Sequence, residues 1–183
     1  MIIDLRDHWA EIERLAREWH VLMGNIVPNK ALAPRHASLV DAQIDGMAGE
    51  YAVSLALHGS VVPARNRHLD AIAQARARVA GGDGGVDGSI GKLTYEVKTT
   101  RLPTGRLLLP ANVQSRAAVL ILAVGATGDR TYPPCLRLAG WIPRSFFDRL
   151  STLDERLPRP APALDQRHLF DMSVLIKMME GFR

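Results

Sequence analysis

Two charged residues, Glu96 and Lys98, stand two positions apart in a stretch where apolar and polar residues alternate. The alternation predicts a half-buried β-strand from Leu93 to Lys98. Residues i and i+2 of a strand point to the same face about 6 to 7 Å apart, so these two side chains lie side by side. The carboxylate can hold a hard cation, and the ammonium can orient or deprotonate a water molecule. The alternative is an ordinary ion pair across the strand face.

A second carboxylate, Asp87, lies nine residues upstream in the glycine-rich segment Gly84–Gly88. If this segment begins a strand that pairs antiparallel with Leu93–Lys98, Asp87 comes opposite Glu96 on the same face. Like charges at that position destabilise a sheet unless a divalent cation or a proton offsets them. The alternative is an ordinary turn residue in a flexible turn. Asp83 is a rival for the same role, and its greater distance from the strand favours Asp87.

A third carboxylate, Glu50, falls in a predicted helix that runs from an N-cap at Ser38 to about Leu57, with Gly59 as its stop. Interior glycines cost about 1 kcal/mol each relative to alanine, so Gly46 and Gly49 require a packing reason. Close approach of this helix to a sheet supplies one and would bring Glu50 near the strand face. The alternative is a position on a solvated helix surface.

The remaining elements follow from periodicity and from turn residues. Strand patterns predict a central strand buried on both faces at Ala118–Val124 and a further strand at Cys135–Ile142. The other expected elements are a helix over Leu5–Leu22, a short strand at Val61–Val62, a helix or inserted loop over His68–Ala80, a short helical segment at Asn112–Arg116, a helix over Arg144–Leu150, a linker over Leu157–Ala163 and a last helix over Leu169–Met179.

Composition places the 183-residue chain among compact soluble domains, with 47% hydrophobic residues and one cysteine, Cys135. A single cysteine excludes an internal disulfide framework, and no Cys/His spacing fits a zinc site. The longest apolar run is shorter than a membrane span and the N-terminus is charged, so we expect a cytoplasmic protein without membrane association. The stretch from Asn66 to Thr127 holds eight basic and four acidic residues, which accounts for the whole net charge of +4. A basic stretch that retains a few acids suggests a polyanion partner, and the alternative is a solvated arginine-rich face.

Glu50 in a helix, Asp87, and Glu96-Val97-Lys98 in a strand together resemble the PD-(D/E)xK nuclease superfamily, over roughly Ser38 to Leu150. Val86 precedes Asp87 where the motif's name has proline. The resemblance implies a restriction-endonuclease-like core: an α/β domain with a mixed central β-sheet flanked by helices. It assigns residues 38–150 to the catalytic core, 1–35 to a helical extension, and 157–183 to a linker and C-terminal helix of one nuclease-like domain.

The resemblance also implies Mg²⁺-dependent hydrolysis of phosphodiester bonds in DNA, with Mn²⁺ as a substitute. Asp87, Glu96 and the Val97 carbonyl would bind the ion, Lys98 would help to activate water, and Glu50 would bind a second ion or a bridging water. Gln114 is an accessory candidate. The basic stretch contains one aromatic residue, Tyr95, on the expected buried face, which favours recognition of the DNA backbone over stacking on bases. The arginines expected to do this are Arg67, Arg76, Arg78, Arg101, Arg106 and Arg116.

Two alternatives belong to other classes. The first is a catalytically silent nucleic-acid-binding module that uses the basic surface alone. The second is a subunit of a larger DNA-processing or defence complex, in which the last helix docks a protein partner or forms a homodimer. The alternative for that helix is simple packing on its own domain.

Overall fold

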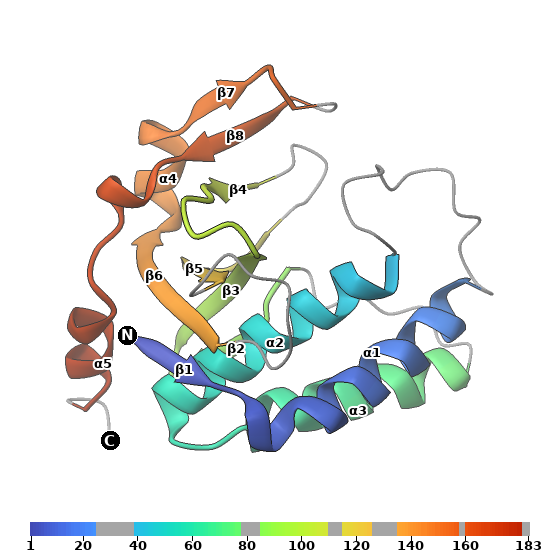
Figure 1. Ribbon diagram of the computed structural model, residues 1–183. Helices are drawn as coiled ribbons and strands as arrows, with labels where there is room; N and C mark the ends of the chain where they lie inside the picture. Colours follow the sequence, from blue (N-terminus) through green and yellow to red (C-terminus); the bar gives the residue numbers. More distant parts are fainter. Residues whose placement is uncertain (25–38, 78–84, 110–114, 126–134, 158–159, 181–183) are drawn as a thin grey trace.

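The computed structural model describes residues 1–24, 39–77, 85–109, 115–125, 135–157 and 160–180. These residues form a mixed α/β structure (Figure 1). The helices are α1 (Trp9–Gly24), α2 (Leu39–His58), α3 (Val62–Arg76), α4 (Arg144–Leu150) and α5 (Met172–Glu180), with 3₁₀ turns η1 (Arg6–His8) and η2 (Gln166–His168). The strands are β1 (Ile2–Asp4), β2 (Gly88–Ile90), β3 (Leu93–Thr100), β4 (Leu107–Leu108), β5 (Val119–Gly125), β6 (Cys135–Pro143), β7 (Thr152–Asp154) and β8 (Ala161–Leu164). Over the same ranges, none of the helices has the length and apolar character that a membrane span needs.

The larger sheet has the strand order β1-β6-β5-β3-β2. β3 and β5 are parallel, and the other neighbouring strands pair antiparallel. β5 lies in the middle, and every residue from Val119 to Val124 is buried. An uninterrupted apolar run is what a strand covered on both faces requires, so the predicted central strand is confirmed. A smaller sheet has the order β4-β8-β7.

Alternate residues of β5 enter two separate cores, one on each face of the larger sheet. Val119, Ile121 and Ala123 join a large cluster with apolar side chains of α1, α2 and α5. Leu120, Leu122 and Val124 join a smaller cluster that includes Leu107, Phe147 and Leu164, from β4, α4 and β8. Figure 1 shows α1, α2 and α3 on one side of the larger sheet and the β4-β8-β7 sheet on the other. Because successive side chains of a strand point to opposite faces, β5 packs on one face against the helical layer and on the other against the layer that contains β4, α4 and β8.

Helix α2 lies close to β3, and one of its glycines is the reason that it can. A Cβ added at Gly49 would lie 1.9 Å from Thr99 Oγ1, which leaves no room for a side chain. The predicted close approach of this helix to the sheet is therefore confirmed at Gly49. It is not found at Gly46, where a Cβ would meet nothing within 4 Å. Gly59 ends the helix with φ of +67°, a conformation that favours glycine, as predicted.

The segment between α2 and the glycine-rich turn differs from its prediction. Val61 and Val62 form no strand, because α3 begins at Val62 and continues to Arg76. Pro63 stands in the first turn of this helix. N–H groups in this turn have no acceptor within the helix, so proline loses no hydrogen bond here, and its fixed φ suits the helix. Because α3 begins before the predicted helix, Arg67 and His68 lie in the middle of a helix beside α2.

The C-terminal part also differs from its prediction, because Leu157–Ala163 is not simply a linker. Its last residues begin β8, which lies between β4 and β7. The final helix begins at Met172, three residues later than expected, and buries Met172, Leu175 and Met179 in the chain's own large core. Simple packing on its own domain, the alternative to docking, is what the structure shows for this face of α5.

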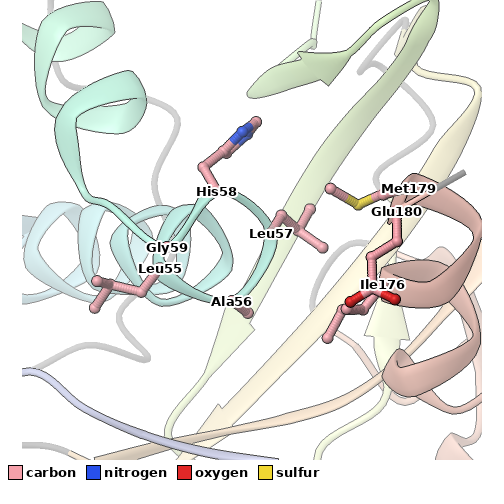
Figure 2. A pocket seen from close by; sticks show the side chains of 8 residues that line it. All are labelled: Leu55, Ala56, Leu57, His58, Gly59, Ile176, Met179 and Glu180. Atoms are coloured by element: carbon pink, nitrogen blue, oxygen red, sulfur yellow. The ribbon is translucent and has the colours of Figure 1, made fainter. Parts of the chain in front are cut away.

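A cavity of about 230 Å³ lies between the C-terminal end of α2 and α5. Figure 2 shows Leu57 pointing toward Met179 and Glu180 of α5, while His58 points away from that helix. His58 instead brings its Nε2 within 3.4 Å of the Tyr95 hydroxyl. The cavity lining contains none of the residues that the sequence singles out for chemistry.

Candidate active site at the edge of strand β3

Asp87 lies directly before β2, and its side chain binds the exposed edge of β3. β2 pairs antiparallel with β3, as predicted, but the register covers only Leu93–Tyr95. The Asp87 N–H donates to the Tyr95 carbonyl at 2.8 Å, and the Val97 N–H donates to Asp87 Oδ2 at 2.7 Å. The Asp87 carboxylate therefore takes the place of the backbone carbonyl that would accept the Val97 N–H if β2 continued along β3. The Val97 carbonyl points to this same edge, because the N–H and C=O of one strand residue point the same way.

Glu96 and Lys98 lie side by side on β3, as predicted, and the Lys98 ammonium forms an ion pair with Glu96 Oε1. They align with Leu120 and Leu122 of β5 and so face the smaller core. Glu96 is only 2% exposed, whereas the Lys98 side chain is 28% exposed. Among the described residues, none donates a hydrogen bond to Glu96 Oε2. Burying a carboxylate costs several kcal/mol unless its oxygens are satisfied, so this second oxygen is a candidate ligand for a cation.

Glu50 lies on α2 and contacts two consecutive residues of α3. The Arg67 guanidinium forms an ion pair with Glu50 Oε2, and His68 Nε2 lies 2.9 Å from the same oxygen. The His68 ring also stacks on Tyr51, with ring centroids 6.2 Å apart. The Glu50 side chain is 15% exposed, so the predicted alternative of a solvated helix surface does not describe it.

Arg67 connects this cluster to the strand edge, because its Nη1 lies 3.5 Å from Asp87 Oδ1. Glu50 and Asp87 thus share one guanidinium, while Glu96 is held by Lys98 on the face of β3 that looks toward the smaller core. Of the predicted residues, the structure brings Glu50 and Asp87 together through Arg67 and Glu96 together with Lys98, and each carboxylate has a cationic partner. Within the described part of the chain, no three His, Cys, Asp or Glu side chains form a group that could hold a metal ion. The donor set that the sequence predicts, Asp87, Glu96 and the Val97 carbonyl, consists of oxygen atoms, which is the chemistry that Mg²⁺ prefers.

Sequence reasoning did not find the roles of Arg67 toward Glu50 and of His68. Arg67 was expected at the DNA backbone, and His68 was expected at the start of a helix or loop. A signal was present, because Ala64, His68 and Ile72 follow one another at intervals of four and are the buried residues of α3. A histidine on that stripe indicates a buried polar contact, but its partner depends on how α3 packs on α2.

The arginines predicted to contact the DNA backbone divide into several kinds. Most of those described contact acids: Arg67 contacts Glu50 and Asp87, Arg76 contacts Glu18, Arg101 contacts both oxygens of Asp45 at 2.7 Å, and Arg106 contacts Asp154. Arg116 is exposed. Arg78, the accessory candidate Gln114 and the rival aspartate Asp83 lie outside the described residues. Ion pairing reduces the charge that the paired arginines offer to a phosphate, so the basic stretch is less open to a polyanion than its composition suggests.

Two tyrosines beside the site are buried, and burial raises the pKa of both phenols. The pKa of Tyr95 rises to about 12, opposed by Arg67 and reinforced by Asp87. The pKa of Tyr51 also rises, chiefly through burial and then through the charge of Glu11. Both phenols therefore stay neutral in the folded protein at pH values where an exposed tyrosine ionises.

This difference predicts a loss of stability at alkaline pH. A folded-state pKa above the unfolded value of about 10 means that the contribution is complete below pH 10 and is lost as the pH rises toward 12. Between pH 9 and 11 we expect the free energy of unfolding of the wild type to fall by about 1 kcal/mol more than that of Tyr95→Phe. Urea titrations at the two pH values measure this difference, and equal losses in the two proteins would contradict it.

Comparison with protein-family models, curated proteins and solved structures finds no match to this chain. The resemblance to the PD-(D/E)xK superfamily therefore depends on Glu50, Asp87 and Glu96-Val97-Lys98.

Proposed function

We propose that this chain is a Mg²⁺-dependent nuclease with a restriction-endonuclease-like core that hydrolyses phosphodiester bonds in DNA. The observation that carries the proposal is the buried Glu96 carboxylate, which has Lys98 on one oxygen and no hydrogen bond from the described residues on the other. A second carboxylate, Asp87, binds the N–H of Val97, the residue that follows Glu96 on β3. The order of the helix α2, the β2-β3 hairpin, the buried strand β5 and the strand β6 also agrees with the resemblance.

Each residue has a role in this proposal. Asp87, Glu96 and the Val97 carbonyl hold the divalent ion, with Mn²⁺ as a substitute for Mg²⁺. When bound, such an ion stabilises the charge that develops on the phosphate and lowers the pKa of a bound water. Lys98 orients the attacking water and stabilises its hydroxide form, since its ammonium lies beside Glu96 and is partly exposed. Glu50 supplies a second carboxylate for another ion or a bridging water.

The test compares wild type with Asp87→Asn in Mn²⁺ binding and in cleavage of plasmid and branched DNA. The amide oxygen can still accept the bond from the Val97 N–H, so the hairpin should fold, but the charge that attracts the cation is gone. We expect cleavage to fall about 100-fold, which corresponds to about 3 kcal/mol of lost transition-state stabilisation. Mn²⁺ binding should weaken in parallel.

Asp148→Asn is the matched control, because Asp148 is a half-exposed carboxylate of α4 that forms an ion pair with Arg144. It should cleave and bind Mn²⁺ as the wild type does. A wild type that binds no Mn²⁺ and cuts neither DNA would contradict the proposal.

The second candidate is a catalytically silent nucleic-acid-binding module. It is favoured by one observation: each of the three carboxylates already contacts a cationic side chain in the described structure. Binding of DNA by wild type and Asp87→Asn with equal affinity, without cleavage or cation binding, would support this candidate.

A further inference from the structure

Arg67 contacts two of the carboxylates of the proposed site through the two terminal nitrogens of its guanidinium. One nitrogen pairs with Glu50 Oε2 on α2, and the other lies 3.5 Å from Asp87 Oδ1 at the edge of β3. All three side chains are largely buried, with exposures of 26% for Arg67, 15% for Glu50 and 12% for Asp87. Two carboxylates held this close in a poorly hydrated place repel each other unless a cation lies between them.

We propose that Arg67 is a built-in counterion shared by Glu50 and Asp87, and that it leaves Asp87 when Asp87, Glu96 and the Val97 carbonyl take up a divalent ion. The inference rests on the proposed function, because it concerns how the same site acquires its metal. The Val97 N–H already occupies Asp87 Oδ2, so a guanidinium and a divalent ion compete for Asp87 Oδ1. Arg67 thus keeps the metal-free protein folded and at the same time weakens its affinity for the ion.

Release of Arg67 and binding of the ion are thermodynamically linked. If Arg67 must leave Asp87 before an ion can bind, the free energy of that contact is subtracted from the metal affinity. Coupling between two such events typically changes affinity by 5- to 150-fold. Lys98 does not share this position, since it contacts Glu96 on the face of β3 that looks toward the smaller core. His68 contacts Glu50 independently of Asp87, so we expect α2 and α3 to stay connected when the guanidinium moves.

The experiment measures Mn²⁺ binding to the full chain without DNA, by electron paramagnetic resonance of the free ion, together with thermal melting. We expect Arg67→Gln to bind Mn²⁺ about tenfold more tightly than wild type. In metal-free buffer the variant should melt at a lower temperature than wild type, because Glu50 and Asp87 have lost their counterion. Added Mn²⁺ should then raise its melting temperature by more than that of wild type.

Arg76→Gln is the matched control, since it removes the same charge from the same helix at a residue that pairs with Glu18. Its Mn²⁺ affinity should equal that of wild type. If Arg67→Gln does not fold, Arg67→Lys is tested in its place. A single ammonium cannot contact both carboxylates as the two nitrogens of a guanidinium do. The Mn²⁺ affinity of Arg67→Lys should therefore be higher than that of wild type.

The outcomes separate the two proposals. Mn²⁺ binding that is equal in wild type and in the Arg67 variants, or weaker in the variants, overturns the exchange and leaves the nuclease proposal standing. Absence of Mn²⁺ binding in wild type and all variants overturns both. Tighter binding in Arg76→Gln as well as in the Arg67 variants would also overturn the exchange, because the effect would then come from net charge alone.

Discussion

Glu96→Gln and Lys98→Met are expected to abolish the proposed DNA cleavage alike but to shift the stability of the metal-free protein in opposite directions. Glu96 is almost fully buried, and Lys98 is partly exposed. Neutralising the buried carboxylate removes a desolvation cost and leaves an ammonium that water can reach. Removing the ammonium leaves a buried carboxylate without its counterion.

The magnitudes follow from these environments. Glu96→Gln should leave the free energy of unfolding unchanged or raise it by about 1 kcal/mol, and Lys98→Met should lower it by about 3 kcal/mol. For a domain of this size that loss corresponds to a melting temperature roughly 10 °C lower. Cleavage should fall about 1000-fold in Glu96→Gln, since a bound metal ion supplies several kcal/mol of transition-state stabilisation. The fall should be about 100-fold in Lys98→Met.

Urea unfolding in metal-free buffer and plasmid cleavage in Mg²⁺ measure the two effects. Mg²⁺ should stabilise wild type and Lys98→Met, which keep Glu96, and should not stabilise Glu96→Gln. A strong loss of stability in Glu96→Gln would show that the fold needs this charge. The pair would then be an ordinary structural ion pair, the alternative that the sequence leaves open.

Gly49→Ala is expected to destabilise the protein by about 3 kcal/mol, at the upper end of the range for overpacking. The new Cβ would lie 1.9 Å from Thr99 Oγ1 and 3.1 Å from Thr99 Cβ, so the hydroxyl must rotate away and α2 and β3 must separate by a few tenths of an ångström. Such a movement would also displace Glu50, the next residue of α2, from Arg67 and His68. Thermal and urea unfolding test the prediction, and Thr99→Ala in the same chain should restore part of the loss by removing the hydroxyl.

Gly46→Ala is the matched control in the same helix. A Cβ there meets nothing within 4 Å, so the substitution should stabilise the protein by up to about 1 kcal/mol through helix propensity. Equal effects of the two substitutions would mean that α2 does not depend on its contact with Thr99.

Helix α2 and strands β3, β5 and β6 were predicted from the sequence within one or two residues, whereas α1 begins at Trp9, four residues later than predicted. The glycine that ends α2, the alternation along β3 and the continuous apolar run of β5 are each local sequence signals that can be read without the rest of the chain. The short edge strand β1 has no such signal, because three residues become a strand only by pairing with β6.

The strand β8 is the clearest case in which pairing overrides local signals. Its Pro162 argues against a strand, yet β4 and β7 pair on its two sides and its alanines and Leu164 are buried. The local sequence does not reveal these pairing partners, so the proline-rich segment was interpreted as a linker.

By itself the sequence determined that Glu96 and Lys98 share one face, since the period of two belongs to the strand. It also determined that a glycine-rich helix can approach that strand. Only the tertiary structure decided that Glu96 is buried, that Asp87 binds the backbone of β3, and that Arg67 and His68 reach Glu50 from α3. These contacts join residues on separate elements, and their geometry depends on how helices and sheet pack together. Local sequence encodes the direction of a side chain along its own element, but the partner of a buried charge is chosen by packing.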